Sequence, residues 1–197
     1  MYLTVDLASK FSAAVLRDER GEVRWQGDSS GLSAKQWCEK LASVAALGAE
    51  YADSPLHILV EDVPYGISNQ AMVKPVLRLQ GMLISALEEF EFYFVNPSTW
   101  QKEFEGVGRS PKGLTKAEGA KYRIDKAEGY AKELGYEAPD LIAKWQEANP
   151  SLKPLKKYTN PLEKSRTDYV DAFLMNVWLE RHVHDYKTLT GVQPPLI

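Results

Sequence analysis

The chain of 197 residues has little cysteine and no long hydrophobic run. Its one cysteine, Cys38, excludes an internal disulfide framework and is typical of a reducing compartment, so we expect a cytoplasmic protein. No apolar run approaches the roughly 18 residues that can span a bilayer, and we expect no membrane partner. The first predicted strand follows Met1 directly, which leaves no room for a signal peptide.

The chain also lacks glycine-rich phosphate loops and a coherent set of histidine ligands, and each absence argues against one class of site. Sugar-kinase and actin-like ATPases share an opening β-hairpin and a strand-end aspartate, but they duplicate this domain and need glycine-rich phosphate loops. A chain of 197 residues without such loops argues against that class. The histidines offer no coherent ligand set, because His182 and His184 lie three or more helical turns beyond the nearest candidate site residue, Asp171. We expect them at the surface.

The net charge of −3 conceals a segregation of charge along the sequence. Residues 102–126 carry seven Lys or Arg against four Asp or Glu, and residues 153–166 carry five against one. Residues 1–101 carry eight against thirteen. Two basic segments on an acidic body are typical of a groove that binds a polyanion. The alternative is that these lysines are only solvated loop residues.

Hydrophobic periodicity predicts an α/β protein with three strands before its first helix. Strands are expected at 2–6, 13–17, 23–26, 57–61 and 92–95. Helices are expected from a capping box at Ser33, over 70–89, over about 116–134 and over about 168–183, with loops at 106–116 and 149–161. This order, with an antiparallel first trio, is the ribonuclease-H-like plan: a mixed five-stranded sheet flanked by helices.

Four carboxylates stand where that plan would gather them at one edge of the sheet. Asp6 and Glu61 end the first and fourth strands, which lie side by side in the plan, and the last helix would bring Asp168 and Asp171 to the same place. Asp168 and Asp171 are three residues apart and share one face of the expected first turn. Hard oxygen ligands suit Mg²⁺ or Mn²⁺, so the set predicts metal-dependent chemistry on phosphates.

Each acid also has an innocent explanation. Asp168 and Asp171 could simply favour a helix N-terminus through the macrodipole, and Asp6 and Glu61 could be solvated turn residues at strand ends. Agreement of all four with one fold favours the metal site. Asp62 follows Glu61 and should point to the opposite face of the sheet.

The chain resembles the RuvC-type Holliday junction resolvases in these residues. The four acids match that family's set in order and context, with D-x-x-D-A as Asp168 to Ala172. The segment from Lys102 to Lys112 is similar to the family's K…GxGxxxK substrate-binding stretch. The turn after Asp6 lacks the glycine common in bacterial members, and residues 135–163 look like an insertion. Both departures suggest a divergent branch, such as a viral one acting in the host-cell cytoplasm.

The resemblance implies a single nuclease domain over residues 1–197 that resolves four-way DNA junctions by paired nicks. Two Mg²⁺ (or Mn²⁺) ions per site would clamp one phosphate, about 3.5–4 Å apart. Asp6 would bridge both ions, Glu61 would complete one, and Asp168 with Asp171 the other. The DNA-binding residues are expected to be Tyr65, Lys102, Arg109, Lys112 and Lys116, with Tyr65 touching bases at the branch point.

Paired nicks on a two-fold junction also imply a homodimer. The predicted helix 70–89 is the candidate interface, because its apolar residues cover more of its circumference than one core stripe requires. The alternative is a central helix buried on both sides. For the activity, the alternatives are a flap or branched-DNA endonuclease or a ribonuclease H of the same fold, and a catalytically silent DNA-binding module.

Overall fold

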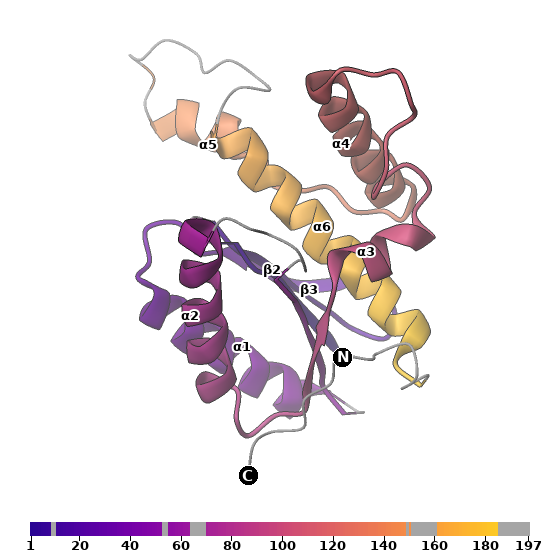
Figure 1. The fold of residues 1–197 in the computed structure, drawn as a ribbon. Helices are drawn as coiled ribbons and strands as arrows, with labels where there is room; N and C mark the ends of the chain where they lie inside the picture. The colour runs from indigo at the N-terminus through magenta and orange to yellow at the C-terminus, as the bar shows by residue number, and fades with distance from the viewer. Residues whose placement is uncertain (9–10, 53–54, 64–69, 149, 151–160, 185–197) are drawn as a thin grey trace.

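The computed structural model describes the chain except for residues 9–10, 53–54, 64–69, 149, 151–160 and 185–197 (Figure 1). One five-stranded sheet forms its centre, in the order β3-β2-β1-β4-β5. The strands are β1 Tyr2–Asp6, β2 Ala13–Arg17, β3 Val23–Asp28, β4 His57–Glu61 and β5 Phe92–Val95. The pairs β1–β2 and β2–β3 are antiparallel, and β1–β4 and β4–β5 are parallel. The predicted mixed sheet with its antiparallel first trio is confirmed.

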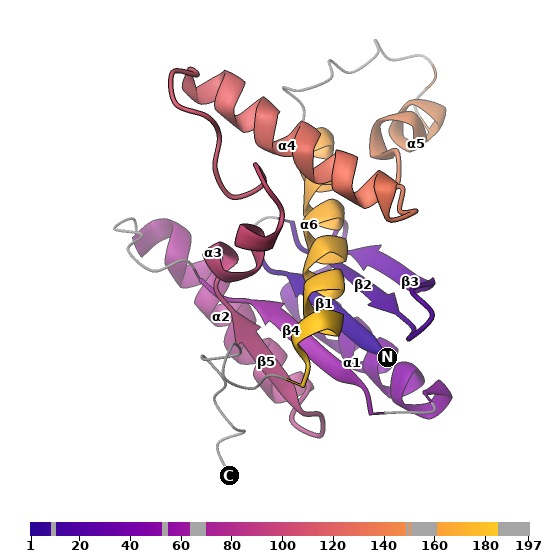
Figure 2. The ribbon, with the colours of Figure 1, turned by 90° about the vertical axis from the view of Figure 1, so that its right-hand side faces the viewer.

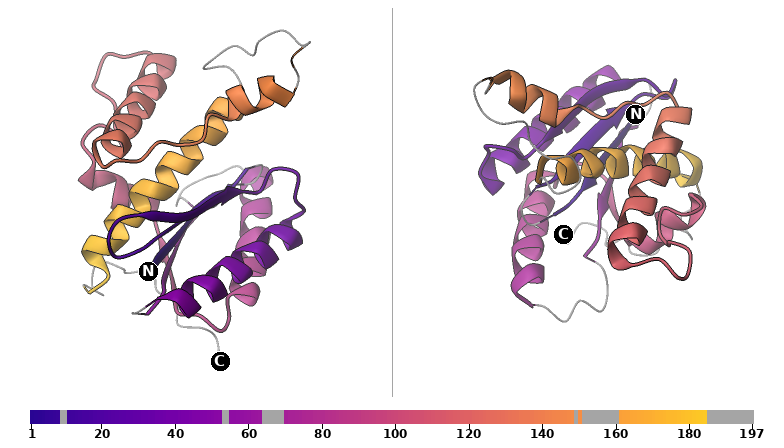
Figure 3. Two further views of the ribbon diagram at one scale, coloured as in Figure 1. Left: turned by 180° about the vertical axis from the view of Figure 1, so that it is seen from behind. Right: turned by 90° about the horizontal axis from the view of Figure 1, so that it is seen from above.

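Helices cover both faces of this sheet (Figures 1 and 3). One face carries α1 (Ala34–Tyr51) and α2 (Gln70–Ala86), and the other carries α6 (Pro161–His182) with α4 (Lys116–Glu133) outside it. Two short helical turns, α3 (Pro97–Trp100) and η1 (Gln101–Glu103), follow β5, and α5 (Leu141–Ala148) packs on α6. Figure 2 shows α6 running across the sheet, with α4 and α5 near its first turns.

Strand alternation divides the core into two clusters. Leu3, Val5, Ile58 and Val60 point to the α1–α2 side, where Trp37 and Leu41 of α1 are buried. The alternate positions, such as Val15 and Leu59, point to α6 and its neighbours. Every second residue of a strand lies on the same face, so a side chain two residues from Leu59 or from Val15 also faces α6. This alternation determines the direction of the acids at the strand ends.

The last helix begins earlier than the sequence predicts. We expected its start at about Asp168, but α6 begins at Pro161, a residue that suits the first helical turn. Asp168 and Asp171 therefore lie about two turns inside the helix. Both are too far from the N-terminus to cap it or to meet its dipole, so the innocent explanation of this pair is wrong.

The segment after α4 is more than a surface insertion. Tyr136 is buried and stacks on Phe173 of α6, with ring centroids 4.1 Å apart, and Tyr136 Oη donates to Gln26 Oε1 of β3 at 2.8 Å. The helix α5, over residues for which we predicted no element, packs on α6 as well. Most of the predicted loop 149–161 lies outside the described residues. Within the described part, no helix is long and apolar enough to cross a membrane.

Candidate active site

Parallel pairing of β1 and β4 brings Asp6 and Glu61 together. Val5 of β1 is in register with Val60 of β4, so the next residues, Asp6 and Glu61, end neighbouring strands at the same edge of the sheet. Both lie an even number of residues from positions that face α6, and their side chains take that face. Asp6 is only 5% exposed. The reading of Asp6 as a solvated turn residue is therefore wrong.

Buried polar contacts fix the position of α6 along β1. Thr4 Oγ1 donates to the carbonyl oxygen of Ala172 at 2.6 Å, and Asn176 Nδ2 donates to the carbonyl oxygen of Tyr2 at 2.6 Å. Asn176 also donates to the Val15 carbonyl oxygen at 3.2 Å. Thr4, Ala172 and Asn176 are each fully buried. These contacts set both the height and the direction of the helix on the sheet.

The spacing of these contacts brings Asp168 and Asp171 of α6 close to Asp6. Asp168, Ala172 and Asn176 follow one another at intervals of four and form one stripe of α6. Asp168 lies one turn, about 6 Å, before Ala172, and Asp6 lies two residues, also about 6 Å, beyond Thr4. Because α6 runs opposite to β1, the two steps lead in the same direction. The sequence analysis missed Thr4 and Asn176, although an asparagine inside the apolar run 172–179 was a visible signal.

The four acids interact electrostatically. Burial raises the pKa of Asp6 well above its ordinary value, and repulsion from Glu61, Asp168 and Asp171 raises it further. Burial, then repulsion from Glu61 and Asp168, also raises the pKa of Asp171. Burial raises the pKa of Glu61 as well, against the effect of hydrogen bonds from Asp6 and Trp100. Asp6 is thus the acid that the other three all repel.

Asp62 takes the opposite side, as alternation predicts. Its Oδ1 accepts a hydrogen bond of 3.0 Å from Gln80 Nε2 of α2 and one of 2.8 Å from the Val63 N–H. Asp62 therefore joins the loop after β4 to the α1–α2 layer. It has the same charge as Glu61, its neighbour in sequence, but does not belong to the acid cluster.

A divalent cation fits the chemistry of this cluster, with one qualification of geometry. Carboxylate oxygens are the preferred donors of Mg²⁺ and Mn²⁺, and a cation would relieve the repulsion that raises the pKa of Asp6 and Asp171. Among the described residues, however, no three His, Cys, Asp or Glu side chains are close enough together to hold an ion as they stand. Asp6 instead shares a hydrogen bond with Glu61. Binding therefore requires loss of that proton and small side-chain rotations.

Trp100 also contacts the acid cluster, and the sequence analysis did not identify it as a site residue. Its Nε1 donates a hydrogen bond of 3.1 Å to Glu61 Oε1, and its ring is fully buried. The chain then continues directly into η1, which carries Lys102. One residue of the predicted basic segment is thereby placed two positions from a side chain that contacts an acid.

Apart from Tyr65, the predicted DNA-binding residues follow β5: Lys102, Arg109 and Lys112 precede α4, and Lys116 is its first residue. Lys102, Arg109, Lys112 and Lys116 are exposed, and within the described part of the chain none of them forms an ion pair. Tyr65 lies outside the described residues. Most of the second basic segment, 153–166, does so too, and its last residue, Arg166, pairs with Glu128 of α4 at 2.9 Å.

The histidines are far from the acids in the fold. His57 begins β4, at the opposite end from Glu61, and His184 is exposed beyond the end of α6. His182 is partly buried, stacks on Trp178 and contacts Glu103 of η1. The expected surface position is confirmed for His184, whereas His182 is partly exposed and joins η1 to the last turn of α6.

Helix α2 lies at the surface, with apolar side chains exposed on either side of its buried stripe. Leu83 and Leu87 are buried against the sheet, whereas Leu77, Met82 and Ile84 are 50%, 37% and 41% exposed. The alternative that this helix is buried on both sides is therefore wrong. Its end at Ala86 is three residues before the predicted one.

Comparison with known proteins supports the architecture. No family model matches the sequence, and no curated protein matches it. A solved structure of RuvC from Thermus thermophilus matches with a TM-score of 0.50 and 12% identity, over 96% of this chain and 99% of that one. The chain has the ribonuclease-H-like fold of RuvC. A second structure, T. thermophilus RuvC in complex with Holliday junction substrate, matches with a TM-score of 0.49 and 10% identity, over 92% and 96%.

The match with a TM-score of 0.50 extends over almost the whole of both chains, so the RuvC-like fold includes α4 and α6 as well as the sheet. At 12% identity the likeness describes the fold and leaves the chemistry to the residues themselves. Neither comparison supports a viral origin.

Proposed function

We propose that this protein is a metal-dependent endonuclease that resolves four-way DNA junctions. The observation that carries the proposal is the convergence of Asp6, Glu61, Asp168 and Asp171 from three separate elements in one electrostatically coupled cluster. Structural carboxylates are usually paired with cations, whereas repulsion from neighbouring acids raises the pKa of both Asp6 and Asp171. A site that accumulates negative charge in this way suits metal ions and a phosphodiester substrate.

Each acid would have a distinct place in the reaction. Bound divalent ions would polarise the scissile phosphate and lower the pKa of an attacking water. Asp6, which faces the other three acids, is the candidate for a ligand shared by two ions, with Glu61 on one side and the α6 acids on the other. Thr4 and Asn176 keep α6 in register with β1, and hence hold Asp171 and Asp168 beside Asp6.

DNA is the proposed substrate because a segment with exposed cations begins two residues after Trp100, which contacts Glu61. The segment from Lys102 to Lys116 leaves the cluster at Trp100 and continues into α4. Its side chains would bind the phosphates that flank the cut. Tyr65 follows Glu61 closely in the sequence, and its proposed role is to contact bases at the branch point.

Lys112→Ala is expected to weaken DNA binding evenly across sequences and to flatten the salt dependence of the association constant. Loss of one phosphate contact removes about one counterion from the slope of log K against log salt concentration. Fluorescence anisotropy with a labelled junction between low and moderate salt measures this slope. Lys35→Ala is the matched control, because Lys35 is exposed on α1 across the sheet. An unchanged slope for Lys112→Ala would make this loop ordinary solvated surface.

One substrate panel tests the proposed function. The protein is incubated with Mg²⁺ and equal concentrations of a four-way junction, a flap, a linear duplex and an RNA–DNA hybrid. The proposal expects paired, symmetric nicks in the junction and little cleavage of the duplex. Preferred cleavage of the flap or the hybrid would assign the same chemistry to another substrate. Binding without any metal-dependent cleavage would indicate a silent DNA-binding module.

The active form is proposed to be a homodimer that pairs through α2. Leu77 and Ile84 are seven residues apart and form an uncovered apolar patch on one side of this helix, which a second copy could bury. Leu77→Glu is expected to produce monomers in analytical ultracentrifugation at micromolar concentration, because it places a charge in the interface. A wild-type protein that sediments only as a monomer, with and without junction DNA, would contradict the dimer.

A further inference from the structure

The indole of Trp100 has one polar partner, a carboxylate oxygen of the acid cluster. The Nε1–H group donates to Glu61 Oε1 at 3.1 Å, and the whole side chain is 0% exposed. An indole N–H can donate but cannot accept a hydrogen bond, and a buried one usually requires a partner. Glu61 satisfies this donor. In return, Trp100 holds one of the two carboxylate oxygens of Glu61, which also shares a hydrogen bond with Asp6.

The local fold places this donor with few adjustable bonds. Glu61 is in register with Val95 at the end of β5. Asn96 then caps the next turn by accepting from the Ser98 N–H at 3.0 Å, and Pro97 occupies the first helical position. Four residues of α3 turn the chain back, so that Trp100 lies over the end of the neighbouring strand. The capped turn thus determines where the N–H group points.

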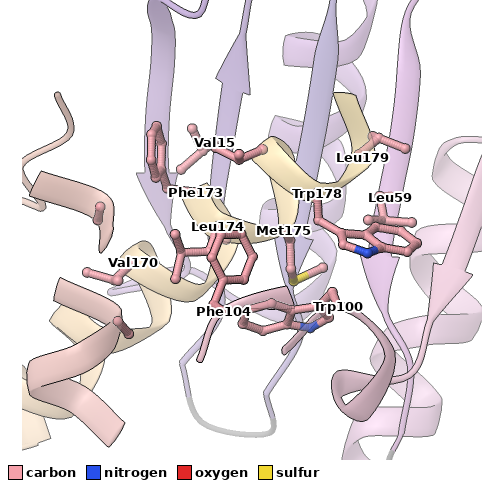
Figure 4. Packing of buried hydrophobic residues seen from close by; sticks show 14 of the residues in the cluster. Val15, Leu59, Trp100, Phe104, Val170, Phe173, Leu174, Met175, Trp178 and Leu179 are labelled. Carbon is pink, nitrogen blue, oxygen red and sulfur yellow. The ribbon is translucent and has the colours of Figure 1, made fainter. Parts of the chain in front are cut away.

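Close packing holds the ring in place. Trp100 and Phe104 meet edge to face, with centroids 6.3 Å apart and an angle of 67°. Met175 and Trp178 of α6 belong to the same buried cluster (Figure 4). A ring enclosed on these sides cannot change rotamer without opening the core. The hydrogen-bond donor is therefore as rigid as the helix that also carries Asp171.

We propose that Trp100 is a positioning residue that orients the Glu61 carboxylate for metal binding. This inference rests on the proposed function, since it assigns Glu61 a metal to bind. Outer-shell donors of this kind fix the orientation of a ligand, and their loss typically costs a metal site about 10–100-fold in affinity or activity. The indole itself cannot bind the metal or exchange a proton, so its effect passes entirely through Glu61.

Trp100→Phe isolates this role, because phenylalanine keeps an aromatic ring in the core and removes the N–H donor. The matched control is Trp37→Phe. Trp37 is equally buried, at 1% exposure, but lies in the α1–α2 layer, and its Nε1 has no hydrogen-bond partner in the described structure. Both substitutions delete the same group from a buried ring. Only one of them removes a contact with the acid cluster.

Metal affinity is measured by titrating Mn²⁺ into the DNA-free proteins in a calorimeter. Trp100→Phe is expected to raise the Mn²⁺ dissociation constant about 10–100-fold, whereas Trp37→Phe leaves it unchanged. Junction cleavage by Trp100→Phe should require correspondingly more metal and should recover largely when the metal is saturating. A merely structural role would lower stability in both variants and leave both dissociation constants at the wild-type value.

A measurement on the unsubstituted protein covers the case in which Trp100→Phe does not fold. Substoichiometric Mn²⁺ should broaden the indole N–H resonance of Trp100 before that of Trp37, because paramagnetic broadening falls steeply with distance. Equal Mn²⁺ affinities of the two variants overturn the inference while the proposed function stands. Equal broadening of the two resonances overturns both, because Mn²⁺ would then not bind beside Glu61. A wild-type protein that binds no Mn²⁺ overturns the proposed function itself.

Discussion

Asp6→Asn is expected to nearly abolish DNA cleavage while the protein stays folded and continues to bind junctions. Asp6 faces Glu61, Asp168 and Asp171, and an amide supplies a neutral oxygen and two N–H donors where a metal requires an anionic oxygen. The loss should exceed the roughly 10–100-fold typical of an outer-shell partner. Glu61→Gln and Asp171→Asn should have similar effects, and Asp168→Asn a smaller one if that residue binds metal through water.

Asp62→Asn is the matched control for these variants. It removes the same charge one residue from Glu61, but on the face of the sheet that contacts Gln80 of α2. We expect it to retain cleavage. DNA affinity of the four site variants should stay equal or rise, because each loses a negative charge facing the phosphate. Steady-state cleavage rates and anisotropy measure the two properties separately. Full activity of a folded Asp6→Asn protein would contradict the assignment of the site.

Asp6→Asn is also expected to stabilise the metal-free protein at pH 7. Burial and repulsion from the other acids raise the pKa of Asp6 in the folded state, so the charged form opposes folding. The contribution of protonated Asp6 to the free energy of unfolding is complete below the unfolded pKa of Asp, about 3.9. It is lost as the pH rises through the higher pKa of Asp6 in the folded state. Asn carries no charge at any pH. The stability gain of Asp6→Asn should therefore be greatest near neutral pH and shrink towards pH 4.

Thermal unfolding in a chelator at several pH values measures this difference. For a chain of this size, each kcal/mol gained at neutral pH raises Tm by about 2–4 °C. Added Mg²⁺ or Mn²⁺ should stabilise the wild-type protein and reverse the order of the two, because only the wild-type site keeps its anionic ligands. A Tm of Asp6→Asn that lies below the wild type by the same amount at every pH would show that Asp6 is not repelled.

The sheet and the strand-end acids were predictable because their signals are local. The runs 2–5 and 57–60 are each followed by an acid, and a period of two assigns each side chain to a face. Parallel pairing of β1 and β4 then follows from the fold plan. Even the opposite orientation of Asp62 was predicted from alternation alone, and its contact with Gln80 agrees with that prediction.

The depth of the acids in α6 could not be predicted in the same way. The residues before Asp168 include Pro161 and several lysines. This composition is as typical of a loop as of a helix, so the sequence does not locate the start of the helix. In the structure α6 packs against α4 and α5, and Arg166, before Asp168, pairs with Glu128 of α4; these contacts come from distant parts of the chain. Tertiary packing overrode the local signal here.

Long-range hydrogen bonds were the other feature that the sequence concealed. Thr4 reaches a carbonyl 168 residues away, and Trp100 reaches a carboxylate 39 residues away. Nothing in the neighbouring residues indicates these partners. An isolated Asn176 in an apolar helix and a tryptophan just after a helix cap mark positions where a buried polar group needs a partner, but identifying that partner requires the fold.

Anomalous diffraction from crystals grown with Mn²⁺ tests the central claim most directly. The account predicts manganese peaks bounded by Asp6, Glu61, Asp168 and Asp171, with a separation of about 3.5–4 Å if two ions bind. Crystals of Asp6→Asn under the same conditions should lose at least one of the peaks. A wild-type crystal without manganese at these carboxylates, at a metal concentration that supports DNA cleavage in solution, would contradict the account.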